Sequence, residues 1–312
     1  MHGNLTGTGQ LTGLRLAPPA NSHAVVPWQP PPYADSDSFD EHDVTLGAGP
    51  LAVPGMLSLP HKSGLLPALV FLGGSGPVDR DTTIGPNKPL KDLAWGLATL
   101  GVAVLCFDKV TYAHPNEVKK NRAFTVADEY LPDALAGIRL PDSPGHRRNA
   151  YFLVRHSLGG TIAPRIAATE PLVAGLVILA GGAEPMHWAA VREVRYLASL
   201  DPATADASQP VIGTMTAQAN RVNRPDLSLE TPDDELPFGV PAPYWLDLRS
   251  YDPVAVATSL RKPMLILQGG GTTKRPWPTT LAGGRPHPPM PMTRRCCGQP
   301  LSCWIALPSP RT

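Results

Sequence analysis

The chain has 312 residues, with 27 basic and 26 acidic side chains and a formal net charge of +1. This length accommodates one large α/β domain or two small ones. The near-zero charge argues against a nucleic-acid partner or an anionic membrane surface. No apolar run reaches the roughly 20 residues of a membrane helix, and the start lacks the pattern of a secretion signal. We therefore expect a cytoplasmic protein.

The first expected segment is an irregular N-terminal arm over residues 1–40, which are rich in Pro, Ser and Gly. Residues 41–270 then alternate between short apolar runs and helical patterns. The expected strands are a hairpin over 44–59 and single runs at 67–72, 102–107, 151–154, 176–180 and 263–269, with helices at 90–100, 126–140 and 159–168. Strands alternating with helices predict right-handed crossovers and a mostly parallel, doubly wound sheet, hence an α/β fold.

Two regions interrupt this alternation. Residues 184–260 interrupt it before the last strand, and an insertion of this size predicts a cap. Residues 271–312 contain no Asp or Glu, nine of the 38 prolines and three of the four cysteines. Those cysteines are too clustered for a disulfide framework and lack histidines at zinc-like spacing. We therefore predict an irregular tail and no metal site.

A candidate nucleophile lies between the expected strand 151–154 and the helix that follows. The string His156-Ser157-Leu158-Gly159-Gly160 places a serine on a sharp strand-to-helix turn. Such a turn, the nucleophile elbow, raises the hydroxyl above the sheet beside the N–H of the next residue. The alternative interpretation is an ordinary helix N-cap serine. We predict Ser157 as the nucleophile, with His156 and Gly159 supporting the elbow.

A glycine-rich loop, Gly73-Gly74-Ser75-Gly76, follows the strand at 67–72. Its backbone can present the N–H of Ser75 toward a developing oxyanion beside the N–H of Leu158, with Gly74 supporting the loop. The alternatives are a simple turn or a phosphate cradle. The loop lacks the glycine strings of the common nucleotide-binding motifs, so we predict no nucleotide cofactor.

These motifs, together with Gly85-Pro86-Asn87-Lys88-Pro89 and the run ending Phe107-Asp108-Lys109, resemble the bacterial α/β-hydrolase carboxylesterases of the EstD type. The resemblance covers about residues 40–270. It implies an α/β-hydrolase fold, a Ser-Asp-His triad and hydrolysis of small acyl esters through an acyl-enzyme, without a cofactor. It also implies that Ser157 is the nucleophile and that the amides of Leu158 and Ser75 form the oxyanion hole.

The chain departs from this family after residue 270. In this fold the triad acid and then the histidine follow the nucleophile in the sequence, but no carboxylate follows residue 270. The one later histidine, His287, lies in a proline-rich string that is poorly suited to orient an imidazole. We therefore expect the final strand and helix of the fold to be missing. A reading-frame shift near codon 270 is our hypothesis for the departure, and resequencing the DNA there tests it.

Arg155 is a second departure, because the family has glycine two residues before the nucleophile. Strand and helix come close together at this turn, so a long side chain has to leave a crowded position. Either the turn relaxes or the elbow is damaged.

The leading functional interpretation is a serine carboxylesterase, impaired in this chain by the missing acid and histidine, with a small-molecule ester as substrate. One alternative is a non-catalytic protein that binds an acyl ligand, and another is a peptidase or lactone hydrolase on the same scaffold. The sequence leaves the oligomeric state open.

Overall fold

The computed structural model describes residues 2–5, 11–15, 27–140, 146–200, 202–269 and 301–306. They divide into two units, which we describe separately. The sheet unit comprises the described parts of Trp28–Lys120, Ala127–Ala183 and Asp252–Thr312, and the helical unit those of Met1–Pro27, Asn121–Val126 and Glu184–Tyr251.

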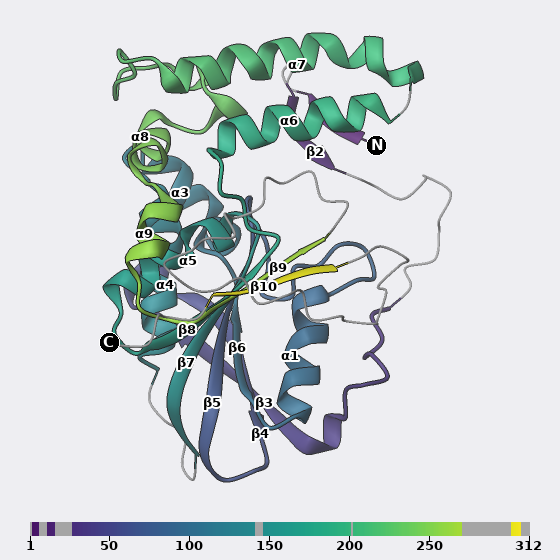
Figure 1. The fold of residues 1–312 in the computed structure, drawn as a ribbon, viewed down its shortest axis with the longest axis vertical. Coiled ribbons are helices and arrows are strands. Elements are labelled where there is room, and N and C mark those ends of the chain that lie inside the picture. Colours follow the sequence, from purple (N-terminus) through teal and green to yellow (C-terminus); the bar gives the residue numbers. More distant parts are fainter. Residues whose placement is uncertain are drawn as a thin grey trace. The chain divides into compact units, whose positions relative to one another are not determined.

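The sheet unit is built on strands in the order β10-β9-β8-β7-β5-β6-β4-β3 (Figure 1). These strands are β3 (Phe39–Leu46), β4 (Val53–Pro60), β5 (Gly64–Leu72), β6 (Ala103–Phe107), β7 (His146–His156), β8 (Val173–Leu179), β9 (Met264–Gly269) and β10 (Leu301–Ala306). The five strands from β6 to β9 in this order run parallel, whereas β3, β4 and β10 pair antiparallel with their neighbours. The prediction of a mostly parallel sheet is confirmed.

Helices cover both faces of this sheet. They are α1 (Pro89–Thr99), α2 (Val110–Ala113), α3 (Pro115–Lys120), α4 (Val126–Ile138), α5 (Leu158–Thr169) and α9 (Pro253–Ser259). Figure 1 shows α1 on one side of the sheet and α4, α5 and α9 on the other. Helix α1 buries Leu90, Ala94 and Ala98, which share one helix face at spacings of four residues.

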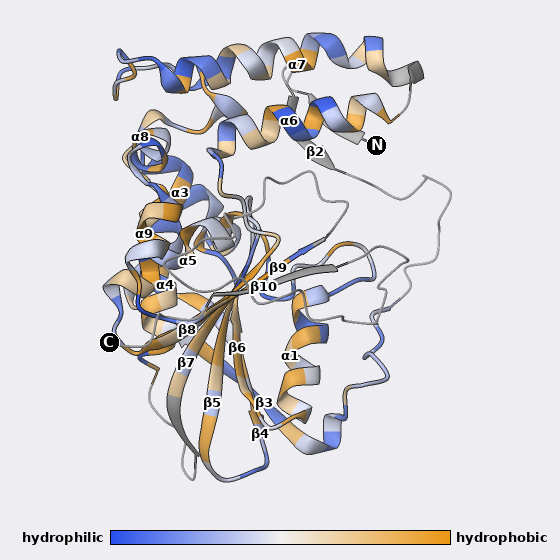
Figure 2. Ribbon diagram, in the orientation of Figure 1, coloured by the Kyte–Doolittle hydropathy of each residue, from blue (hydrophilic) through white to orange (hydrophobic). Residues whose placement is uncertain are grey.

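The core lies between these layers. Strand β6 is buried at every position, as expected of a parallel strand covered on both faces. On the α1 side, Phe71, Val104 and Val154 from three neighbouring strands pack together with Leu90 and Ala94. Figure 2 shows apolar residues concentrated along β5, β6 and β7. This core fixes the ends of β5 and β7, from which the two candidate loops leave the sheet.

The helical unit contains α6 (Met186–Ser199), α7 (Pro202–Asn223), α8 (Ala242–Ser250) and the short hairpin β1 (His2–Leu5) and β2 (Leu11–Arg15). Two 3-10 turns, Asp233–Glu235 and Pro237–Gly239, lie before α8. The hydrophobic core of the helical unit contains Trp245, Val222, Leu227, Leu236 and Ala242. No helix in the described ranges is long and apolar enough to cross a bilayer.

The structure differs from the sequence expectations in three places. The expected irregular arm 1–40 contains β1, β2 and the start of β3, and the expected irregular tail 271–312 contains β10. The expected insertion 184–260 contains α9, which packs on α5 within the sheet unit. We also expected the final strand and helix of the fold to be missing. This expectation falls in part on residues 270–300 and 307–312, which lie outside the described residues.

Candidate active site

Ser157 occupies a strained corner between β7 and α5. Its backbone torsions are φ 56° and ψ −123°, a conformation that non-glycine residues rarely adopt. The Ser157 N–H donates to the carbonyl of Leu179 on β8 at 3.0 Å, and the Thr161 N–H donates to the Ser157 carbonyl at 3.2 Å. Such strain costs on the order of 1–3 kcal/mol and persists where the surroundings enforce it, commonly at functional sites. The corner has the geometry of a nucleophile elbow.

Two glycines permit this corner. A Cβ at Gly159 would lie 2.6 Å from the carbonyl oxygen of Gly73, and one at Gly160 would lie 3.0 Å from Cγ2 of Ile178. The first distance is too short for any side chain, so α5 can approach the end of β5 only with glycine at position 159. The structure thus explains on steric grounds why residue 159, which we predicted to support the elbow, is a glycine.

The glycine loop after β5 lies against the elbow. A Cβ at Gly74 would lie 3.0 Å from Cβ of Ser157 and 3.3 Å from Nδ1 of His156. Gly74 is buried, Ser75 is exposed and Ser157 is half-buried. Leu158 begins α5, and the first N–H groups of a helix have no partner within it. The structure therefore brings the sequence-predicted residues Ser157, Leu158, Gly74 and Ser75 to one place.

His156 is the last residue of β7 and is exposed. Its imidazole lies beside Gly74, and its role in supporting the elbow stays a prediction. His287 lies outside the described residues, as does every residue between β9 and β10. At the end of β9, the amide of Gln268 is buried and has no hydrogen-bond partner among the described residues.

A buried ion pair, which sequence reasoning missed, holds the glycine loop from behind. Nζ of Lys109 lies 2.7 Å from Oε1 of Glu129, and both side chains are buried. The same Nζ donates to the carbonyls of Gly74 at 2.8 Å and Gly76 at 2.9 Å. Tyr130 donates its hydroxyl to the Gly74 carbonyl at 2.7 Å. The available signal was a lysine two residues after a fully buried strand, since such a charge requires partners when it is buried.

Arg155 is completely buried in β7, and none of its three guanidinium nitrogens has a hydrogen-bond partner within the described ranges. Burial lowers its pKa well below the ordinary value, opposed only by the nearby Tyr130. Strand β7 still pairs with β5 and β8 at this residue. Of the two outcomes expected from the sequence, neither a relaxed turn nor a broken one is seen. Instead, the elbow is kept and the guanidinium is buried.

The other reactive groups considered in the described residues do not form a second candidate site. Burial raises the pKa of the Cys106 thiol strongly, so this thiol stays protonated and is a poor nucleophile. No group of three or more His, Cys, Asp or Glu side chains in the described ranges could hold a metal ion. The sheet unit therefore offers the elbow and its loop as the candidate site.

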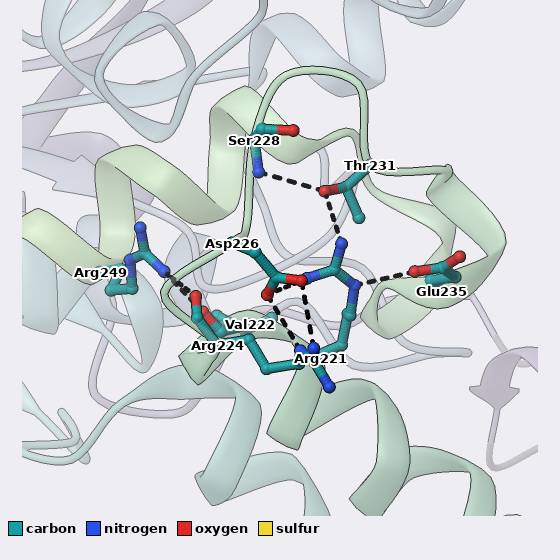
Figure 3. Close-up of polar contacts among 8 residues, drawn as sticks. All are labelled: Arg221, Val222, Arg224, Asp226, Ser228, Thr231, Glu235 and Arg249. Carbon is teal, nitrogen blue, oxygen red and sulfur yellow. Dashed lines mark hydrogen bonds and ion pairs between the residues drawn. The ribbon is translucent and has the colours of Figure 1, made fainter.

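The helical unit contains an arginine-rich polar cluster at the end of α7 (Figure 3). Arg221 bonds to Asp226, Glu235 and Thr231, and Arg224 bonds to Asp226. Arg249 of α8 donates to the carbonyls of Val222 and Arg224 and so satisfies the end of α7. Because these guanidinium groups already bind carboxylates or carbonyls, the cluster joins α7 to α8 and is not a candidate anion site.

Comparison with known proteins relates the chain to esterases and peptidases. Over 240 residues the chain is 35% identical to Esterase EstD of Thermotoga maritima, covering 77% of this chain and 54% of the esterase. The chain thus spans about half the length of this curated relative. No family model matches this chain. Among solved structures, Est1E of Butyrivibrio proteoclasticus has a TM-score of 0.45 at 15% identity, covering 72% of this chain and 76% of Est1E. The acylaminoacyl peptidase of Pyrococcus horikoshii has a TM-score of 0.44 at 15% identity, covering 73% of this chain and 32% of the peptidase.

The strand order, the doubly covered sheet and the elbow at the end of β7 define an α/β-hydrolase. The sequence relationship narrows this class further. Over the aligned 240 residues the chain is a homologue of Esterase EstD.

Proposed function

We propose that this chain carries the site of a carboxylic ester hydrolase with Ser157 as its nucleophile. The observation that carries the proposal is the strained Ser157 corner with Gly74 against its Cβ. In the proposed reaction, Oγ of Ser157 attacks the ester carbonyl carbon, and the amides of Leu158 and Ser75 stabilise the oxyanion. Collapse of this intermediate breaks the bond to the leaving oxygen, which takes up the proton lost by the Ser157 hydroxyl and departs as the alcohol. Water then attacks the acyl-enzyme, which releases the acid and returns a proton to Oγ of Ser157.

We further propose that turnover is impaired. A serine hydroxyl needs a neighbouring base to become a strong nucleophile, and the sequence after residue 270 supplies no carboxylate to orient one. Catalysis without a working triad is on the order of 10³–10⁴ over water. The relationship to EstD supports a small-molecule ester as the proposed substrate class. The cytoplasmic location and the absence of nucleic-acid partners stay predictions.

Fluorophosphonate labelling and hydrolysis of short p-nitrophenyl esters test the proposal. We expect slow labelling and slow hydrolysis by the wild-type chain, and the loss of both in Ser157→Ala. Ser259→Ala is the matched control, because Ser259 is exposed on α9 and its hydroxyl donates only to the Val256 carbonyl. Ser75→Pro removes the N–H assigned to the oxyanion hole, so hydrolysis should fall by roughly 10²–10³.

The outcomes separate the alternatives. Labelling that persists in Ser157→Ala rejects the assigned nucleophile. Saturable binding of a fatty acid or ester, without labelling or turnover, favours a non-catalytic acyl-ligand-binding protein. Faster turnover of p-nitroanilides or lactones than of esters favours the peptidase or lactone hydrolase alternative.

A further inference from the structure

Lys109 is a completely buried cation surrounded by oxygen atoms. Four of them lie within 3.0 Å of Nζ: the carbonyls of Gly74 and Gly76, Oε1 of Glu129 and the hydroxyl of Tyr130. The three N–H bonds of an ammonium group are thus shared among four acceptors. We propose that Lys109, Glu129 and Tyr130 are positioning residues that aim the Ser75 amide at the oxyanion. This proposal rests on the function proposed for Ser157.

The direction of the Ser75 amide follows from the bonds made behind it. In a trans peptide the C=O of one residue and the N–H of the next point in opposite directions, and the described residues contain no cis peptide. The Gly74 carbonyl accepts hydrogen bonds from both Lys109 and Tyr130. The Ser75 N–H, on the same peptide, therefore points away from this pair of donors. Gly74 faces Cβ of Ser157, so this peptide lies beside the elbow.

Three separate segments build the device. The loop follows β5, Lys109 follows β6, and Glu129 and Tyr130 are neighbours on α4. Tyr130 accepts a hydrogen bond from Lys109 at 3.0 Å and donates its own O–H to the Gly74 carbonyl at 2.7 Å. Thr111 adds a hydrogen bond to Glu129 at 3.2 Å. Because the loop carbonyls are tied to side chains on two other elements, they cannot turn without breaking a buried ion-pair network.

Charge strengthens this arrangement. Burial lowers the pKa of Lys109, and the Glu129 carboxylate opposes that effect through its charge and its hydrogen bond. A charged donor forms stronger hydrogen bonds to carbonyls than a neutral one. Preorganised donors are effective because they need not reorient during the reaction. The network therefore fixes the direction of the Ser75 amide, as the helix geometry fixes the direction of the Leu158 amide.

Tyr130→Phe is the sharpest test, because it removes one hydroxyl and leaves the ion pair in place. Tyr112→Phe is the matched control, since Tyr112 is exposed on α2. We expect Tyr130→Phe to lower both kcat on p-nitrophenyl esters and the fluorophosphonate labelling rate roughly tenfold or more, with KM changed less than twofold. Hydrogen exchange of the peptide covering residues 73–78 should become faster in Tyr130→Phe and stay at the wild-type rate in Tyr112→Phe.

A second variant, Lys109→Met/Glu129→Gln, removes both charges together, so no buried ion is left alone. We expect the same loss in kcat and the same faster exchange at 73–78. If both variants label and exchange as the wild type does, the positioning role is wrong. If the wild type shows no Ser157-dependent labelling, the proposed function fails, and exchange at 73–78 alone then decides whether the network orders the loop.

Discussion

Two buried cations near the elbow differ completely in their surroundings. Lys109 has four oxygen atoms within 3.0 Å of Nζ. Arg155, equally buried, has no hydrogen-bond partner at any of its three nitrogens in the described residues. A buried charge is tolerated when it is paired and costly when it is not. We infer that the Lys109 site is built around its charge, whereas Arg155 is a side chain imposed on a site suited to a small residue.

The largest expected effect is that of removing the paired cation. Lys109→Met leaves the Glu129 carboxylate buried without the lysine cation that balances its charge, so unfolding free energy should fall by about 3–5 kcal/mol. Urea denaturation followed by circular dichroism measures this loss. Lys120→Met is the control, because the Lys120–Glu117 pair is exposed and 3.8 Å apart.

The double variant Lys109→Met/Glu129→Gln should recover much of that stability, because it removes the orphaned charge as well. Equal destabilisation of the single and double variants would contradict the view that the cost comes from Glu129.

Asp133 extends the comparison to carboxylates, because it lies one helical turn after Glu129 on α4. Burial raises the pKa of Asp133 to about 7, an effect that the nearby His114 partly opposes. The folded state therefore holds this proton more tightly than the unfolded state. Stability should fall as the pH rises from about 4 to about 7, and the penalty is complete above that range.

Asp133→Asn removes this titration, so it should stabilise the protein at pH 8, by at most about 4 kcal/mol for a shift of about 3 pKa units. The advantage over wild type should shrink steadily as the pH is lowered to 4.5. Urea denaturation of both proteins across this range is the measurement. A difference that does not change with pH would show that Asp133 titrates normally in the fold.

Arg155→Met should change the unfolding free energy in the opposite direction to Lys109→Met. Arg155 has no hydrogen-bond partner among the described residues, so replacing it by an apolar side chain of similar length should raise the unfolding free energy by about 1–4 kcal/mol. Arg261→Met, an exposed arginine in the same unit, controls for the general effect of the change. Destabilisation by Arg155→Met would contradict this prediction and would mean that the Arg155 guanidinium is paired in the folded protein.

The elbow could be predicted from sequence because its requirements are local. A buried strand, a serine and two glycines within a few residues dictate the turn, and Gly159 occupies the position where no side chain fits. The buried network could not be predicted in this way. Its members come from positions 74, 109, 129 and 130, and only the packing of β5, β6 and α4 in the fold brings them together. The Asp108-Lys109 string indicated a family but not a role.

Helix α7 is a second element whose structure the local sequence does not indicate. Its proline-containing, polar sequence favours a broken stretch, yet Pro202–Asn223 is one continuous helix with Pro210 inside it. A proline removes a single helix hydrogen bond and bends the helix, and packing against α6 outweighs that local cost. Local propensity therefore failed where contact between elements decided the structure.

The smallest expected effect concerns a buried group that folds in its neutral form. His187 is buried on α6, where its Nε2 lies 2.9 Å from Oδ1 of Asn223. Burial lowers the pKa of His187, and the Asn223 contact only partly opposes this. Because the folded-state pKa lies below the unfolded value of 6.5, protonation favours unfolding. Stability should therefore be intact above about pH 6.5 and decline below it.

His187→Gln should remove this decline, which tryptophan fluorescence can follow in urea titrations at pH 7.5, 6 and 5. His42→Gln, at an exposed histidine, is the control and should parallel the wild type. Lys109, Arg155 and His187 would then represent three outcomes of burying a basic group: paired, unpaired and neutral. If wild type and His187→Gln lose stability in parallel between pH 7.5 and 5, His187 is not the titrating group, and the third outcome is not realised in this chain.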